Sequence, residues 1–287
     1  MSIVYLNGAF LPAEQARISP MDRGFLFGDG VYEVVPSYDG QFIGLVPHIE
    51  RMLSGLAQLS IEPGLSLHDW QQLARQLLQQ NQQMGENLGV YIQVSRGADT
   101  KRNHAFPAHI TPTVFAFVFE IPPAPVADKD KAPKYSVVTA DDLRWQRCHI
   151  KSTSLLGNVL HYQQGYAQGA QETILFNREG NLTEAAACNV FIVKDGVIAT
   201  PPLSTELLPG ITRHILLQVL ARFSQRQVEE RIISRAEVLA ADEVWLTSSS
   251  KEVAPVVRIN DQWVNDGEPG DIWLEVQQLF SAHKYEF

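Results

Sequence analysis

The stretch CHIKSTSLLGN, residues 148–158, places a lysine between a β-like run and the apolar start of a helix. Lys151 is one of only eight lysines in the chain, and lysine is normally an exposed residue. The flanking residues Ile150, Leu155 and Leu156 predict that this lysine is buried. Burial lowers the pKa of a lysine toward the neutral amine, which is the form that attacks an aldehyde. From spacing alone, a lysine at a strand edge with its ammonium group in water is the commoner explanation.

The composition around this stretch is that of a globular protein with two domains. The chain has 287 residues, too many for one small core, of which 45% are hydrophobic and 19% charged. A net charge of −9, without any run rich in lysine and arginine, argues against nucleic acid as a partner.

The cysteines and the apolar runs predict where the protein resides. Two cysteines, Cys148 and Cys188, are too few for a disulfide framework in a chain of this size. No apolar run approaches the roughly 20 residues that span a bilayer, and no signal-like segment opens the sequence. We therefore expect a cytoplasmic protein without a membrane partner.

The first part of the chain predicts a sheet with helices packed on it. A hairpin over residues 1–12 is followed by GFLFGDGVYEVVPSYDGQFIGL, in which apolar residues alternate as in a strand. Val31, Glu33 and Val35 share one side of that strand, and a turn falls at Asp39-Gly40. We expect helices at 48–61 and 67–84 and strands at 89–97 and 113–121.

A proline-rich, charged segment, EIPPAPVADKDKAPK at residues 120–134, predicts a domain boundary. We therefore expect an N-terminal α/β domain at 1–119 and a C-terminal domain at 135–287. Short apolar runs predict the strands of this second domain at 135–140, 172–177, 189–194, 196–201 and 243–248. Helices are predicted near 155–169, 210–224 and 234–241, with a terminal helix at 271–283. The fold class is α/β, or α+β, with more β-structure in the second domain.

Three segments offer groups suited to a phosphate. LPGITRH, residues 208–214, predicts a helix start whose free N–H groups, with the Thr212 hydroxyl, form an anion site. LTSSSKE, residues 246–252, places several hydroxyls just after a strand, and Arg51 in PHIERM adds positive charge. Each has an ordinary alternative: a plain helix cap, a serine-rich turn and a surface arginine.

Two further segments suggest a ring-binding carboxylate and a carboxylate-binding loop. In GNLTEAAACNVF, residues 180–191, Glu184 precedes small residues that would let a flat ring approach the backbone. In GADTKRNHAFP, residues 97–107, Arg102 and His104 lie two apart, close enough to bind one carboxylate. A turn glutamate and a solvated basic loop are the alternatives.

The order of the motifs along the chain carries more information than any one of them. DRGFLFGDGVYEV, PHIERM, YIQVSRG, RNHAFP, DLRWQRCHIKSTSLLGN, LTEAAACNVF, LPGITR and WLTSSSKEVAPV occur in the order seen in class IV aminotransferases. The resemblance covers nearly all of the chain, and within that family it points to the D-amino acid transaminases. It implies a fold type IV enzyme that uses pyridoxal 5′-phosphate. It also implies a smaller N-terminal domain, a larger C-terminal cofactor-binding domain with a β-barrel-like core, and a homodimer.

The resemblance also implies a role for individual residues. Lys151 in HIKS looks like the lysine that forms a Schiff base with the cofactor and transfers protons. Glu184 in LTEA looks like the partner of the pyridine nitrogen. The other implied residues form the phosphate cup, namely Arg51, Ile211, Thr212, Ser248 and Ser249, and the substrate-carboxylate trap, namely Tyr32, Tyr91, Arg102 and His104. In the family Arg102 and His104 would act in the active site of the other subunit.

The Arg-x-His pair favours transamination between D-amino acids, with D-alanine as a donor, and 2-oxo acids such as 2-oxoglutarate and pyruvate. Three features depart from the family pattern: the run Ala185–Cys188 in place of glycine and serines, a loop at 96–104 that is one residue longer, and Lys251 in place of a neutral residue. A branched-chain aminotransferase, an (R)-amine transaminase and an aminodeoxychorismate lyase remain alternatives within the family. A non-catalytic protein that binds the cofactor or phosphate is a more distant one.

Overall fold

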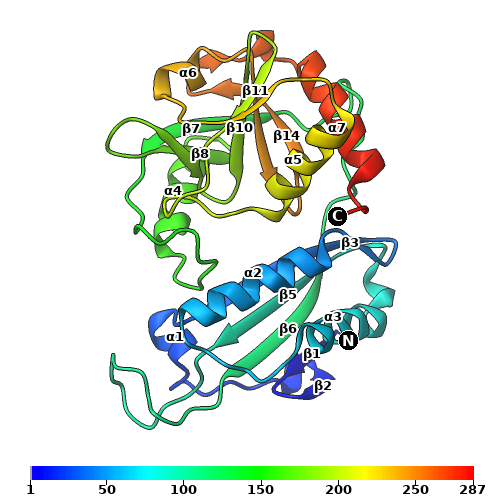
Figure 1. The fold of residues 1–287 in the computed structure, drawn as a ribbon. Coiled ribbons are helices and arrows are strands. Elements are labelled where there is room, and N and C mark those ends of the chain that lie inside the picture. Colours follow the sequence, from blue (N-terminus) through cyan, green and yellow to red (C-terminus); the bar gives the residue numbers. More distant parts are fainter. Residues whose placement is uncertain (1) are drawn as a thin grey trace. The chain divides into compact units, whose positions relative to one another are not determined.

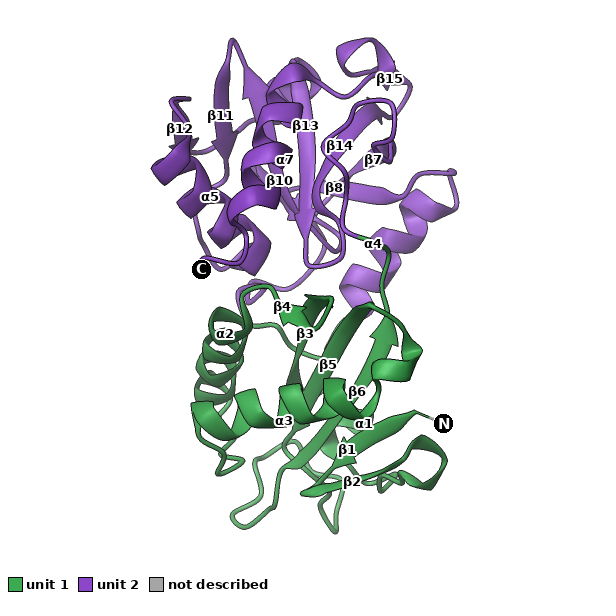
Figure 2. Ribbon diagram, turned by 90° about the vertical axis from the view of Figure 1, so that its right-hand side faces the viewer, with its two compact units in different colours: residues 1–123, 150–155 green, residues 124–149, 156–287 purple. Residues whose placement is uncertain are grey.

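The computed structural model of this chain describes residues 2–287 and divides them into two compact units (Figures 1 and 2). Unit 1 contains the residues up to Pro123 together with Ile150–Leu155. Unit 2 contains Ala124–His149 and Leu156–Phe287. The short segment that carries Lys151 therefore belongs with the N-terminal part of the chain. The linker predicted at 120–134 and the domain boundaries on either side of it stay predictions.

Unit 1 is a six-stranded antiparallel sheet with the strand order β2-β1-β6-β5-β3-β4. Its elements are β1 (Ile3–Leu6), β2 (Ala9–Pro12), η1 (Ala13–Gln15), α1 (Arg23–Phe27), β3 (Gly30–Tyr38), β4 (Gln41–Phe42), α2 (Leu45–Gln58), α3 (Leu67–Gln80), η2 (Gln82–Met84), β5 (Asn87–Ser95) and β6 (Thr113–Glu120).

The two faces of this sheet differ because side chains alternate along each strand. One face packs against α2 and α3 and forms the core, with Val31, Val90 and Ala116 from the strands and Trp70 and Met52 from the helices. The other face carries half-buried aromatic residues from the same central strands. The covered face supplies the stability of the unit, and the half-open face is available for a ligand.

Unit 2 is a mixed sheet with the strand order β12-β11-β10-β13-β14-β7-β8-β9, and β15 is paired with β14. The pairs β11–β12, β14–β7 and β7–β8 are parallel. The strands are β7 (Tyr135–Asp141), β8 (Glu172–Phe176), β9 (Leu182–Ala185), β10 (Asn189–Lys194), β11 (Val197–Thr200), β12 (Val228–Glu230), β13 (Glu243–Ser248), β14 (Glu252–Ile259) and β15 (Gln262–Trp263). The other elements are α4 (Leu156–Tyr166), α5 (Ile211–Phe223), α6 (Arg235–Leu239), η3 (Asn265–Gly267) and α7 (Asp271–His283).

The sheet of unit 2 curls back on itself. The edge strand β9 is joined by a tight turn to β10, which lies in the middle of the strand order, and the Ala185 N–H donates to the Cys188 carbonyl across that turn at 2.7 Å. Apolar side chains such as Phe176, Val190 and Leu246 fill the concave core. This curled sheet corresponds to the β-barrel-like core expected of the second domain.

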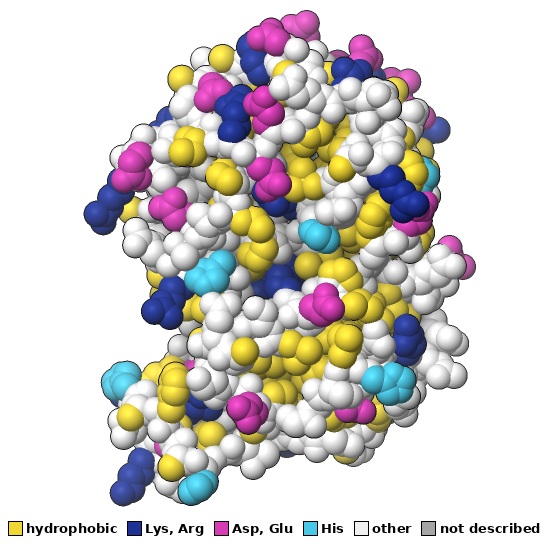
Figure 3. All heavy atoms as spheres, in the orientation of Figure 1, with side chains coloured by type: hydrophobic (Ala, Val, Ile, Leu, Met, Phe, Trp, Pro, Cys, Tyr) yellow, Lys and Arg dark blue, Asp and Glu magenta, His cyan; other side chains and the backbone are white. Residues whose placement is uncertain are grey.

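The element boundaries differ from the predicted ones for local reasons. Helix α2 begins three residues before the predicted position 48, because Pro47 lies in the first turn, where its missing N–H is not needed. Helix α3 ends at Gln80 rather than at 84, because the Asn81 side chain donates to the Leu77 carbonyl at 2.8 Å and so caps the helix end. On the face shown in Figure 3, basic and acidic side chains are interspersed, consistent with a moderate net charge of −9.

Candidate active site

Lys151 is held beside the first residues of β3. The Tyr32 N–H donates to the Lys151 carbonyl at 3.0 Å, and the Thr153 N–H donates to the Gly30 carbonyl at 3.0 Å, so the segment lies alongside the strand. The Lys151 Nζ lies 3.2 Å from the Tyr32 hydroxyl, to which it donates, and 4.2 Å from the ring centroid. The backbone thus fixes an amine next to an aromatic hydroxyl.

The burial predicted for this lysine is correct only in part. Ile150 is buried, but Leu156 is 71% exposed, and Lys151 itself is half-buried. Leu156 does not contribute to this burial, because α4 begins at Leu156 and turns that side chain outward.

A buried charged cluster lies on the covered face of the same sheet. Glu33, 1% exposed, binds Arg51 through two hydrogen bonds of 2.8 and 2.7 Å and His48 at 2.7 Å. Although burial acts to raise the pKa of Glu33, the charges of Arg51 and His48 lower that pKa to about 2. Sequence reasoning missed His48 and gave Glu33 no role. The sequence did offer a signal for a buried charge, because Glu33 lies between Val31 and Val35 on one side of the predicted strand.

Replacing Glu33 by glutamine is expected to lower the free energy of unfolding by about 3 kcal/mol near pH 7. Because the folded pKa of Glu33 lies below its ordinary value of 4.5, its stabilising contribution is present above pH 4.5 and is lost as the pH falls toward 2. Urea unfolding of the wild type and the variant between pH 7 and pH 3 should therefore show a difference that narrows with acidity. Glu50→Gln, an exposed change on α2, is the control. A difference independent of pH would contradict the assignment.

The half-open face of unit 1 brings Tyr32 and Tyr91 together. Their rings stack with centroids 5.6 Å apart, and the Tyr91 ring lies 4.9 Å from that of Phe117. The Tyr91 hydroxyl donates to the Gln93 side chain at 2.7 Å, and burial, with a smaller contribution from Tyr32, raises the Tyr91 pKa to about 12. Tyr91 is therefore a neutral hydrogen-bonding group at physiological pH.

Arg102 and His104 lie in the loop between β5 and β6, and both side chains contact one aromatic ring. The Arg102 guanidinium lies 4.9 Å from the centroid of Phe27, and the His104 ring lies 5.3 Å from it. Both residues are exposed. The structure thus brings the two members of the predicted pair together.

In unit 2, Glu184 is buried and has three donors. Its carboxylate binds Arg144 at 2.5 Å, the Asn189 amide at 3.2 Å and the Leu208 N–H at 3.1 Å. Arg144 also binds Asp142 at 2.8 Å. Burial raises the pKa of Glu184 to about 7, against the opposing effect of Arg144. The result is an unusually basic carboxylate, suited to a protonated nitrogen partner.

Sequence reasoning missed Arg144 and Asn189. Arg144 lies 40 residues before Glu184, and the family pattern that includes DLRWQRC gives this arginine no role of its own. An arginine two residues after an aspartate gives no signal by itself, because only the curled sheet brings β9 next to the segment that follows β7.

Ile211 and Thr212 lie in the first turn of α5, as predicted. No side chain caps this helix start, and its N-cap is Gly210. A Cβ atom on Gly210 would lie 2.0 Å from the Asn189 side-chain oxygen, so glycine is required there. The buried hydroxyls of Thr247 and Ser248 have no hydrogen-bond partner among residues 2–287. Uncapped N–H groups and unpaired hydroxyls are what a phosphate requires.

Four further residues named from the sequence, Ser249, Arg51, Lys251 and Cys188, have different surroundings. Ser249 lies in the turn after β13. Arg51 is bound to Glu33, which satisfies part of its charge. Lys251, one of the departures, lies 5.9 Å from the centroid of the Tyr135 ring. Cys188, another departure, is buried, and burial raises its thiol pKa to about 12, so the thiol is neutral.

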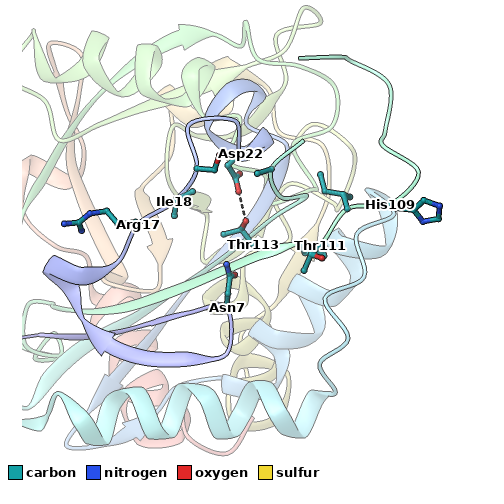
Figure 4. Close-up of a pocket in the computed structure, with 11 residues that line it drawn as sticks. Asn7, Arg17, Ile18, Asp22, His109, Thr111 and Thr113 are labelled. Carbon is teal, nitrogen blue, oxygen red and sulfur yellow. Dashed lines mark hydrogen bonds between the residues drawn. The ribbon is translucent and has the colours of Figure 1, made fainter. Parts of the chain in front are cut away.

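A cavity in unit 1 lies apart from the predicted site residues, none of which lines it. It has a volume of about 360 Å³ and is lined in part by Asp22 and Thr113, whereas Arg17 and His109 point away from these two residues (Figure 4). Within residues 2–287 there is no group of three or more His, Cys, Asp and Glu side chains arranged to hold a metal. The helices of that same part of the chain are all too short or too polar to cross a membrane.

Comparison with known proteins gives a consistent result. The family model for amino-transferase class IV matches residues 30–259. D-alanine aminotransferase of Staphylococcus epidermidis is 36% identical over 284 residues, covering 99% of this chain and 98% of that protein. The same enzyme of Bacillus licheniformis is 38% identical over 274 residues, covering 96% and 94%.

Solved structures show the same fold. A branched-chain amino acid aminotransferase of Escherichia coli matches with a TM-score of 0.88 and 22% identity over 98% of this chain and 94% of that one. The T.th. branched-chain enzyme, complexed with N-(5′-phosphopyridoxyl)-L-glutamate, matches with a TM-score of 0.89 and 21% identity over 99% and 94%. The fold type IV class predicted from sequence is thereby confirmed. The family model and the two D-alanine aminotransferases confirm the predicted family as well, and the chain belongs to the class IV aminotransferases, which are pyridoxal phosphate enzymes.

Proposed function

We propose that this chain is a transaminase that moves an amino group between D-amino acids and 2-oxo acids, with D-alanine as a donor and 2-oxoglutarate or pyruvate as an acceptor. The observation that carries the proposal is the pairing of Arg102 and His104 over the ring of Phe27. An arginine and a histidine side by side bind one carboxylate with several charge-assisted hydrogen bonds. The two D-alanine aminotransferases that share 36% and 38% identity with the chain support the choice of substrate.

The groups that the chain offers fit pyridoxal phosphate. Lys151 supplies a half-buried amine for the aldehyde. Glu184 supplies a buried carboxylate whose raised pKa favours a protonated ring nitrogen. The uncapped start of α5 with Ile211 and Thr212, together with the unpaired hydroxyl of Ser248, suits the phosphate. The resemblance in sequence adds Arg51 and Ser249 to the proposed phosphate site.

Within this proposal Lys151 has two tasks. Its Nζ would hold the cofactor covalently, and Nζ, when free as a neutral amine, would be the group that accepts the substrate Cα proton and gives a proton back. The bound cofactor supplies an electron sink that makes the Cα proton acidic. Tyr32, whose hydroxyl lies 3.2 Å from Nζ, orients the amine.

The remaining residues bind and orient. Glu184 keeps the proton on the ring nitrogen, and Arg144 keeps Glu184 in position. Tyr32, Tyr91, Arg102 and His104 hold the substrate carboxylate. Since the carboxylate and the amine-bearing Cα are both fixed, only one hand of substrate presents its Cα proton to Lys151, and stereospecificity follows.

The proposal includes a homodimer in which Arg102 and His104 act in the active site of the partner subunit. The exposed face of α4 supports an association of this kind. Leu156, Val159, Leu160 and Tyr166 are 71%, 55%, 62% and 67% exposed, and the first three recur at helical spacing on one side. Such a contiguous apolar surface is typical of a protein–protein contact.

The visible absorption spectrum of the purified protein, before and after addition of D-alanine and separately of L-leucine, tests the function. We expect a yellow protein whose cofactor band disappears with D-alanine and persists with L-leucine. Loss of the band with L-leucine alone would assign the chain to the branched-chain enzymes. A band that neither amino acid changes would favour an (R)-amine transaminase or the lyase. A colourless protein that does not take up pyridoxal phosphate would overturn the proposal.

A further inference from the structure

Apart from Phe27, the segment DRGFLFGD, residues 22–29, has no task in the site proposed above, although it belongs to the pattern that identifies the family. Its first residue, Asp22, is 3% exposed. One carboxylate oxygen accepts from the Ser95 hydroxyl at 2.7 Å. The other accepts from the Thr113 hydroxyl at 2.6 Å (Figure 4). Ser95 ends β5 and Thr113 begins β6. Asp22 therefore ties together both ends of the loop that carries Arg102 and His104.

The second residue of the segment holds the middle of that loop. Arg23, 3% exposed, donates to the carbonyl of Asn103 and, at 3.2 Å, to the carbonyl of His104. Its Nε also binds Asp29 at 2.8 Å. Because an arginine side chain has five N–H donors in one rigid plane, it fixes both carbonyls relative to Asp29.

Asp29, which binds Arg23, also binds Arg96, and Arg96 contacts the loop at a second place, Phe106. Arg96 binds both Asp29 oxygens, at 2.8 and 3.0 Å, and its guanidinium lies 3.5 Å from the centroid of the Phe106 ring. Burial acts to raise the pKa of Asp29, but Arg96 and Arg23 lower it below the ordinary value, so the carboxylate is ionised. The loop is thus held within the Arg-x-His pair, at the carbonyls of Asn103 and His104, and just beyond it at Phe106.

Phe27 supports the functional side chains themselves. Arg102 lies 4.9 Å from its ring centroid, His104 lies 5.3 Å from it, and Arg23 lies 4.8 Å from it. The negative face of an aromatic ring attracts a cationic group such as a guanidinium. The Phe27 ring therefore helps to hold the two carboxylate-binding side chains near each other.

We propose that residues 22–29 are the scaffold that positions Arg102 and His104, and that Phe27 is a specificity-determining residue for the substrate carboxylate. This inference rests on the function proposed above. A loop over 96–112 without regular structure would otherwise have to be ordered each time a carboxylate binds. The scaffold orders it in advance, and affinity for the carboxylate rises while the chemistry at Cα is unaffected.

The test replaces Phe27 by leucine, which keeps an apolar side chain and removes the aromatic face. In the holoenzyme we expect KM for D-alanine to rise about tenfold, with kcat changed less than about threefold. Reaction of the bound cofactor with hydroxylamine, a nucleophile without a carboxylate, is expected to keep its rate. Phe25→Leu, on the same short helix and 77% exposed, is the matched control. Equal KM values for D-alanine in Phe27→Leu and Phe25→Leu would contradict the proposed role of Phe27.

Arg23→Lys provides a second variant and a readout that does not depend on turnover. Lysine keeps the charge, but its single ammonium does not reach Asp29 and two carbonyls together. We expect faster tryptic cleavage at Lys101 and Arg102 than in the wild type, together with a raised KM for D-alanine. Unchanged cleavage and an unchanged KM would contradict the proposal.

Arg102→Ala separates this inference from the proposed function. If that variant raises KM for D-alanine and Phe27→Leu does not, only the scaffold is refuted. If Arg102→Ala leaves KM unchanged, Arg102 is not the carboxylate-binding group, and the proposed function fails together with the inference that rests on it.

Discussion

Replacing Lys151 by alanine is expected to abolish transamination, with a loss of at least about 10⁴-fold in turnover, because in the proposed function one residue both holds the cofactor and transfers the Cα proton. The variant should still bind pyridoxal phosphate through the groups of unit 2. Turnover of D-alanine with 2-oxoglutarate is measured in protein saturated with cofactor. Lys194→Ala, which removes a surface lysine paired with Asp242, is expected to remain fully active.

Full turnover of Lys151→Ala with bound cofactor would refute the role of this lysine. The same variant also examines the proposed dimer. If Arg102 acts in the partner subunit, mixing and reassociating the Lys151→Ala and Arg102→Ala proteins should restore activity, because mixed dimers then contain one complete site. Failure to restore activity, with dimers shown to exchange, would place Arg102 and Lys151 in the same chain's site.

Replacing Arg144 by leucine is expected to lower the free energy of unfolding at pH 7 by about 3–5 kcal/mol. The Arg144 side chain is 2% exposed and bridges Glu184 and Asp142. Its loss leaves two buried carboxylates without their cation. Arg147→Leu, an exposed change three residues along the chain, is the control and should lie within about 0.5 kcal/mol of the wild type.

The destabilisation of Arg144→Leu should depend on pH with a definite sign. Burial already raises the pKa of Glu184 to about 7, and without Arg144 that pKa rises further. A group whose folded pKa is raised favours the folded state below its ordinary pKa of 4.5 and loses that contribution as the pH rises. Unfolding in urea at pH 5 and pH 8 should therefore show a larger deficit at pH 8. An equal deficit at both values would mean that Glu184 stays ionised in the variant.

These expectations depend on local patterns in the sequence and on contacts between distant segments. The sequence predicted the local features better than the distant contacts. Hydrophobic alternation located β5 and β6 within two residues, because burial on one face of a sheet imposes a period of two. The same reasoning missed α1. Its five residues are too few for a helical pattern, and the helix depends on the Asp22 side chain accepting from the Gly24 N–H.

The candidate site likewise combines residues that the sequence predicted with partners that it did not predict. Lys151 and Arg102 were predicted because their motifs are contiguous in sequence and resemble a family. The partners that set their chemistry lie far away: Tyr32 is 119 residues from Lys151, and Arg144 is 40 residues from Glu184. A pattern along the chain contains no information on which buried charge will face which, because that depends on how strands pair and how a sheet curls.

The sequence by itself determined the family, the cofactor, and most strands and helices, and it is the source of the proposal that Lys151 is the reactive amine. Only the tertiary structure decided that Arg51 binds Glu33, that Arg144 holds Glu184, and that Phe27 lies under Arg102 and His104. The physical reason is that hydrophobic periodicity and backbone preferences act over a few residues. Charge pairing in a low-dielectric interior acts over a few ångströms between segments that only folding brings together.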